Sequence, residues 1–238
     1  MRTVLAAVLL TSCIPAEESP APAQVAPAVA PEEVPPGTAE HMRTHYRDAL
    51  EIKEAVIAGD LPGVREPARR LREVPGPSPA SWRPYIDNEA ELATRTLSAR
   101  NLATAAKMAG GLANSCGACH EALGGGPRFD PPAAAPVPIA HQAREHMLRH
   151  QWAADRMWDA LVSRNDDIWA SGAELLADAP LQRDDLTADV ELPEELLLLG
   201  DRVHGIGAQA RTTTAWPARA ELYGEFIATC AACHLGGC

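Results

Sequence analysis

The chain has 238 residues and a formal net charge of −11, a length that allows one large domain or two small ones. Its lysines and arginines form no basic stripe, which argues against a nucleic acid partner. Only two Phe and three Tyr are present, and no segment alternates β-branched and polar residues as strands do. The sequence therefore predicts an all-helical protein. A core with so little aromatic bulk would gain from a buried cofactor.

The first thirteen residues, MRTVLAAVLLTSC, are predicted to be an export signal. One Arg precedes an apolar run that is too short to span a bilayer. The last four residues resemble a bacterial lipobox, in which the cysteine, here Cys13, is acylated. An ordinary secretory signal with an incidental Cys13 is the alternative. Both predict export, and the lipobox also predicts a lipid anchor at the periplasmic face of a membrane.

Residues 14–37 are predicted to be an extended tether. They contain seven prolines in 24 residues, a composition that cannot sustain a helix and favours polyproline-like extension. A second Pro/Gly-rich stretch, residues 124–138, predicts a linker. It separates residues 38–123 from residues 139–238.

These two halves are internal repeats. EHMRTH (Glu40–His45) recurs as EHMLRH (Glu145–His150), and each copy opens a helical run that ends in Cys-x-x-Cys-His. Such self-similarity predicts two copies of one domain. The second copy is nine residues longer between its Met and its first Cys, and we place this difference in the acidic stretch 181–195.

Four helices are expected in the first copy. The first covers about residues 38–58, with one seam that consists of Met42, His45, Ala49, Ile52 and Val56. The second follows Asp60, a good N-cap, with Pro62 in its first turn. The third begins near Trp82. Asn101 caps the fourth, whose seam leads to Cys116 and His120.

The second copy repeats this pattern. The seam of its first helix consists of Met147, His150, Ala154, Met157 and Leu161, and its last helix begins near Trp216. Short connections between such helices predict antiparallel neighbours. The expected fold is all-α, with two tandem antiparallel four-helix bundles.

The two Cys-x-x-Cys-His motifs carry the chemistry. They consist of Cys116, Cys119 and His120 in the first half, and Cys230, Cys233 and His234 in the second. This motif is the attachment signature of c-type haem, in which both sulfurs form thioethers and the histidine binds iron. A redox dithiol would need a βαβ context, and zinc would need four ligands in one site. A disulfide, the default in an oxidising compartment, would leave the histidine and the repeat unexplained.

A four-helix bundle with this motif near its end, and with AVIAGDL (Ala55–Leu61) closing the first helix, resembles the cytochrome c prime family and its low-spin relatives. The resemblance implies one haem between the first and last helices of each bundle, hence two covalently bound haem c groups. It makes the four motif cysteines the thioether sites. His120 and His234 become the proximal iron ligands.

The sixth iron ligand stays open at this point. Low-spin relatives use a Met on the first helix, whereas high-spin members place a side chain there that does not bind iron. The candidates are Met42 or His45 for the first haem and Met147 or His150 for the second, and we favour the histidines slightly. The neighbouring His41 and His146 are expected to face solvent. His141 and His204 are expected at the surface, and Cys238 is assigned no role.

The sequence thus predicts a dihaem c-type cytochrome, not an enzyme, that transfers single electrons in the bacterial cell envelope. Redox proteins are the expected partners, and the acidic second half suits a basic one, although a solvated face is the simpler reading. A gas-binding or gas-sensing haem protein with an open sixth site is the alternative. A dihaem peroxidase is disfavoured because no loop carries a catalytic cluster, and a purely structural lipoprotein would leave both motifs unused.

Overall fold

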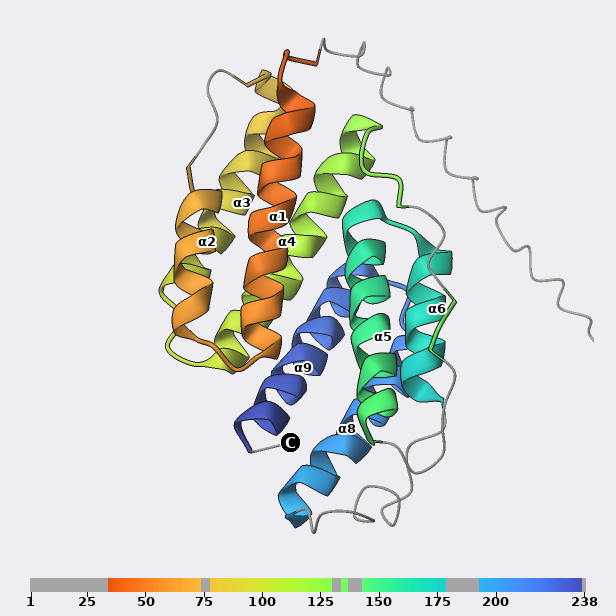
Figure 1. Ribbon diagram of the computed structural model, residues 1–238. Coiled ribbons are helices and arrows are strands. Elements are labelled where there is room, and N and C mark those ends of the chain that lie inside the picture. Colours follow the sequence, from red (N-terminus) through yellow and green to blue (C-terminus); the bar gives the residue numbers. More distant parts are fainter. Residues whose placement is uncertain (1–33, 74–77, 130–133, 137–142, 179–192, 237–238) are drawn as a thin grey trace, which may run out of the picture. The chain divides into compact units, whose positions relative to one another are not determined.

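The computed structural model describes residues 34–73, 78–129, 134–136, 143–178 and 193–236. All of these residues belong to the second of the two units into which the chain divides, Glu33–Cys238. The predicted export signal, Cys13 and most of the predicted tether lie outside the described residues, as do His141 and Cys238. The described part of the second unit contains eight α-helices and no strand (Figure 1). The prediction of an all-α protein is confirmed.

The described helices follow one another in chain order. They are α1 (Thr38–Ile57), α2 (Arg65–Leu71), α3 (Arg83–Leu97), α4 (Leu102–Leu123), α5 (Ala143–Ser163), α6 (Asp166–Ala177), α8 (Glu194–Ala210) and α9 (Trp216–Leu235). Short 3₁₀ turns, Pro62–Val64 and Ala80–Trp82, precede α2 and α3. None of these helices combines the length and the apolar character that a membrane span requires.

Local signals in the sequence fix several helix ends. The Asn101 side chain accepts a hydrogen bond from the backbone N–H of Thr104 at 2.8 Å, as predicted for an N-cap. Trp216 begins α9, with a proline in the first turn. The segment after Asp60 differs from the prediction. Asp60 accepts from the N–H of Gly63 at 2.9 Å, but the chain forms a 3₁₀ turn first and becomes α-helical only at Arg65.

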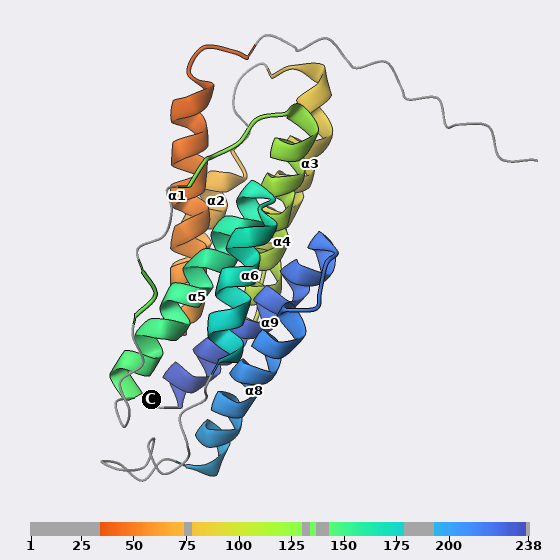
Figure 2. The ribbon, with the colours of Figure 1, turned by 90° about the vertical axis from the view of Figure 1, so that its right-hand side faces the viewer.

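The helices pack in two similar sets of neighbours. In the first set α1 contacts α2, α2 contacts α3, α3 contacts α4 and α4 contacts α1. In the second, α5 contacts α6, α6 contacts α8, α8 contacts α9 and α9 contacts α5. The start of α1 lies near the end of α4, and the start of α5 lies near the end of α9 (Figures 1 and 2). The segments that resemble each other in sequence thus occupy corresponding places.

The two sets meet mainly through α4 and α9, which approach closely at a pair of glycines. A Cβ atom on Gly110 would lie 2.3 Å from the carbonyl oxygen of Ala220, and one on Gly224 would lie 3.1 Å from that of Ala106. Gly110 and Gly224 are 114 residues apart, as are Ala106 and Ala220. The crossing therefore uses the same helical positions in both halves.

Buried polar contacts between α1 and α5 also join the halves. Lys53 is only 2% exposed, and its Nζ lies 2.5 Å from Oδ1 of Asp155. The Tyr46 hydroxyl donates to Oδ1 of Asp159 at 2.9 Å. Because burial disfavours the charged carboxylate, the pKa of Asp159 is raised. Ions this deeply buried need partners, so these contacts hold α1 against α5.

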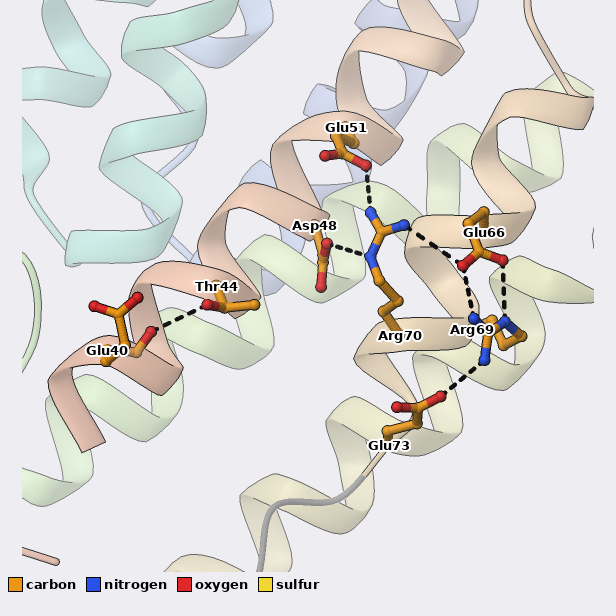
Figure 3. Close-up of polar contacts among 8 residues, drawn as sticks. All are labelled: Glu40, Thr44, Asp48, Glu51, Glu66, Arg69, Arg70 and Glu73. Atoms are coloured by element: carbon orange, nitrogen blue, oxygen red, sulfur yellow. Dashed lines mark hydrogen bonds and ion pairs between the residues drawn. The ribbon is translucent and has the colours of Figure 1, made fainter. Parts of the chain in front are cut away.

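Within the first half, Arg70 ties α2 to α1 (Figure 3). Its Nε donates to Oδ1 of the buried Asp48 at 2.7 Å, and its Nη2 donates to Glu51. The adjacent Arg69 instead pairs with Glu66 and Glu73 on the exposed side of the same helix. Arg70 therefore links α2 to α1, whereas the ion pairs of Arg69 are local and exposed.

The core follows the predicted seams, with one difference at the start of each first helix. Ala49, Ile52 and Val56 are buried, as predicted. Met42 and Met147, however, are 37% and 38% exposed. Their placement on a buried seam was wrong because the residue before each of them, His41 and His146, faces the interior instead.

Candidate functional site

The first Cys-x-x-Cys-His motif lies in the last turns of α4. Cys116 and Cys119 are free thiols. Burial raises the pKa of Cys116 well above its usual value and that of Cys119 to about 11, and the carboxylate of Glu89 adds to both shifts. The two thiols are therefore protonated at neutral pH. A redox-active dithiol needs a lowered pKa, so this pair does not have the electrostatics of a disulfide oxidoreductase.

His120 is oriented by the second half of the chain. Its Nδ1 lies 2.9 Å from the carbonyl oxygen of Val162, near the end of α5. Since a carbonyl can only accept, Nδ1 carries the proton and Nε2 keeps its lone pair. A histidine that binds a metal through Nε2 is typically oriented in this way.

The second motif is held in the same manner by the first half. Nδ1 of His234 lies 2.6 Å from the carbonyl oxygen of Ile57, the last residue of α1. Ile57 and Val162 are 105 residues apart, the same separation as between His45 and His150. Each motif histidine is thus fixed by the corresponding carbonyl of the opposite half. Sequence periodicity gave no signal for these hydrogen bonds, because they depend on how the two halves pack against each other.

The cysteines of the second motif differ from each other. Cys230 is a free thiol, and burial raises its pKa to about 12. Cys233 is disulfide-bonded. A disulfide and a thioether exclude each other at one sulfur atom. The predicted use of Cys233 for haem attachment therefore requires this disulfide to be open.

At the start of α1, a histidine and not a methionine faces the interior. Nδ1 of His45 lies 3.1 Å from Oε1 of Glu89 on α3, which leaves Nε2 of His45 without this contact. The ring of His41 lies 3.9 Å from that of His45, between centroids. Nε2 of His41 is buried without a hydrogen-bond partner, and burial lowers the pKa of His41. The expectation that His41 faces solvent was wrong.

At the start of α5, three histidines converge. We call His146 and His150 on α5 and His204 on α8 the histidine triad. One ring nitrogen from each lies within 4.8 Å of the others. His146 and His150 are 8% and 9% exposed. His146 was expected in solvent and His204 at the surface, and both expectations were wrong because the rings of His146, His150 and His204 lie against one another.

Burial keeps the histidine triad uncharged at neutral pH. It lowers the pKa of His146 to about 4 and that of His150 well below its usual value, and it also lowers that of His204. The buried guanidinium of Arg149, which faces Asp178 at 3.5 Å, acts in the same direction on all three. The neutral rings offer lone pairs. The recurring His-x₃-His spacing of α1 and α5 was the signal in the sequence, but the third histidine carried none.

The first motif has the donors that a covalent haem needs: two free thiols and a histidine whose Nε2 is available. The second matches it at Cys230 and His234 and departs from it at the disulfide of Cys233. Both motifs lie at the end of a helix that faces the start of its half's first helix (Figure 2). No family model, curated protein sequence or solved structure matches this chain at a significant level.

Proposed function

We propose that the protein is a dihaem c-type cytochrome that transfers single electrons. Cys116 and Cys119 would attach one haem and Cys230 and Cys233 the other, with His120 and His234 as proximal iron ligands. The observation that carries the proposal is the pair of Nδ1 hydrogen bonds, from His120 to Val162 and from His234 to Ile57. They leave Nε2 of both motif histidines available to a metal.

Each set of four helices would form one antiparallel bundle around its haem. The first and last helices of each set contact each other, and the motif ends of α4 and α9 lie at the starts of α1 and α5. A planar group between these ends would meet the motif histidine on one side and a first-helix residue on the other. The haem would supply the redox chemistry, and the chain would bind, orient and insulate it.

For the first haem we assign the sixth position to His45. Met42 is 37% exposed, whereas the Nδ1 of His45 is held by Glu89 and its Nε2 is left for iron. A carboxylate on Nδ1 makes an imidazole a stronger ligand. Two histidine ligands also favour the ferric state relative to a Met and His pair, so a low reduction potential follows.

For the second haem the candidates are His150 and Met147. Met147 is 38% exposed, while His150 is buried with an unpartnered Nε2. If neither binds iron, the second haem has an open sixth position, and the gas-binding alternative applies to this half. The histidine triad is the observation that favours the gas-binding alternative in this half, because His150 lies against two other histidines and need not bind iron.

Export, a lipid anchor at Cys13 and redox proteins as partners complete the proposal. They rest on the sequence of residues 1–37 and on the excess of acidic residues in the second half, 16 Asp and Glu against 8 Lys and Arg from residue 139 onward. An acidic surface would attract a basic partner, with an ionic-strength dependence that stopped-flow kinetics would detect. Mass spectrometry of the mature N-terminus would establish whether Cys13 is acylated.

The deciding experiment is spectroscopic. Protein exported in a host that attaches c-type haem should carry two covalent haems, visible as a haem-stained band under denaturing conditions. Cys116→Ala with Cys119→Ala should leave one haem, and Cys230→Ala with Cys233→Ala should leave the other. Absence of covalent haem from the wild-type protein would overturn the proposal. Reductive and oxidising growth conditions compared side by side would reveal whether the disulfide of Cys233 competes with attachment.

A further inference from the structure

The spacing of the histidine triad is close to that of ligands around one metal ion. Nε2 of His146 and Nε2 of His204 are 3.2 Å apart. Two imidazole nitrogens on a tetrahedral Zn²⁺, at about 2.05 Å each, are about 3.3 Å apart. The third nitrogen lies within 4.8 Å of the others, so a modest rotation of one ring completes the arrangement.

Two of the three rings, those of His204 and His150, already have a nitrogen available for a metal. Nδ1 of His204 lies 2.7 Å from the carbonyl oxygen of Leu176, so this nitrogen is the donor and Nε2 is the acceptor. Nε2 of His150 is buried without any hydrogen-bond partner among the described residues. An unpartnered buried nitrogen carries a desolvation cost that a metal ion would relieve.

The corresponding place in the first half lacks the third imidazole. His41 and His45 stand where His146 and His150 stand in the second half, 105 residues earlier. Their neighbour from the third helix is Glu89, which binds His45, and no nitrogen or carboxylate triad of the described residues converges there. The repeats therefore differ in chemistry at an equivalent position.

We propose that His146, His150 and His204 bind one divalent transition-metal ion of the Zn²⁺, Co²⁺ or Cu²⁺ class. Three neutral imidazoles are the donors that such ions prefer, and three protein ligands leave a fourth position open. His146, whose Nε2 now shares a hydrogen bond with His204, binds after moving its proton to Nδ1.

The charges around the histidine triad limit its affinity without abolishing it. Arg149 is a buried cation nearby, but its guanidinium faces Asp178 and donates to the carbonyl of Pro136 at 2.8 Å. Asp201, one turn before His204 on α8, contributes a negative charge that offsets part of the lowering of the His204 pKa by burial. The site thus has partial compensation for an incoming dication.

This inference goes beyond the haem proposal and competes with it for one residue. An ion held by the histidine triad takes His150 away from the second haem iron. In that case His45 and His120 would hold the iron of the first haem, and only His234 would hold that of the second. The proposal therefore also accounts for why α8 places His204 against His146 where α3 places Glu89 against His45.

The test uses the full-length, haem-loaded protein after treatment with a chelator. Isothermal titration calorimetry with Zn²⁺ should give one binding site per chain. Titration with Co²⁺, followed by its optical absorption after subtraction of the haem spectrum, should give the same number. His204→Ala should weaken Zn²⁺ binding by more than about 100-fold, since loss of even an outer-shell partner costs 10- to 100-fold. His41→Ala, at the equivalent α1 position, should leave the binding constant unchanged.

Circular dichroism keeps the test valid if a variant folds poorly. Zn²⁺ should raise the melting temperature of the wild-type protein and not that of His204→Ala or His146→Ala. No saturable binding, or equal binding by His204→Ala, would overturn the inference. The inference would also be overturned if the second haem were low-spin in the wild-type protein and high-spin only in His150→Ala, because His150 would then bind the haem iron. That result would leave the haem proposal intact. Zn²⁺ binding to a protein without covalent haem would reject the haem proposal and retain this site.

Discussion

At the scale of single residues, the decisive features are hydrogen bonds that leave one nitrogen of a histidine free. The carbonyls of Val162 and Ile57 do this for His120 and His234, and Glu89 does it for His45. In each case the partner fixes which nitrogen carries the proton. The chemistry of the site is therefore set as much by these partners as by the motif itself.

The assignment of His45 makes a direct prediction. His45→Ala should convert the first haem from low spin to high spin, because it removes the sixth ligand, whereas Met42→Ala should leave the spectrum unchanged because Met42 is exposed. Electron paramagnetic resonance of the oxidised protein distinguishes the two states. A spectrum that responds to Met42→Ala and not to His45→Ala would reverse the assignment.

A second residue-level prediction concerns the link between α1 and α2. Arg70→Ala should lower the free energy of unfolding by about 1–3 kcal/mol, because the carboxylate of Asp48 is 4% exposed and loses its partner. Chemical denaturation measures this change. Arg69→Ala, one position earlier on the same helix, is the control, since its ion pairs lie at the surface and should contribute little. Equal effects of the two substitutions would contradict the role given to Arg70.

At the scale of elements, the sequence predicted helices well where a local signal exists. Asn101, Trp216 and the apolar periodicity placed α4, α9 and α1 correctly, because caps, prolines and seams act within a few residues. It could not place His204 against His146, which are 58 residues apart. Contacts of that kind depend on the packing of helices that are far apart in the chain. The exposure of Met42 was not predicted for a related reason, since the packing of the helices turns the preceding residue, His41, toward the interior in its place.

The crossing of α4 and α9 gives the element-level prediction. Gly110→Ala should destabilise the protein by about 1–3 kcal/mol, because its Cβ would lie 2.3 Å from a backbone oxygen. Gly205→Ala on α8, where nothing lies within 4 Å, should instead stabilise by about 0.5–1 kcal/mol through helix propensity. Thermal melting of both variants tests the contrast. Stabilisation by Gly110→Ala would contradict this prediction, because it would mean that α4 and α9 accommodate the added methyl group without a loss of packing energy.

At the scale of the whole described unit, the two halves depend on each other. Lys53 of α1 is buried against Asp155 of α5, and each motif histidine donates a hydrogen bond to a backbone carbonyl of the opposite half. The internal repeat was evident in the sequence. The mutual dependence was not, because a repeat says that two parts are alike and not that they touch.

This dependence predicts one cooperative unfolding transition. Two independent domains would melt separately, but separation here would expose the buried Lys53 and the α4 and α9 faces together. Differential scanning calorimetry should give a calorimetric enthalpy equal to the van't Hoff enthalpy for the whole unit. Two resolved transitions would contradict the prediction. Lys53→Ala should lower the midpoint temperature of unfolding, and the variant should still unfold in one transition.

The paired glycines of α4 and α9 also bear on the history of the chain. Gly110 meets Ala220 while Gly224 meets Ala106, so residue i of one half meets residue j of the other and j meets i. That reciprocity is the form of an isologous interface in a twofold dimer. A single-repeat ancestor with this helix would dimerise through the same face. Duplication and fusion would then join two subunits that already fitted, with each histidine still held by its former partner chain.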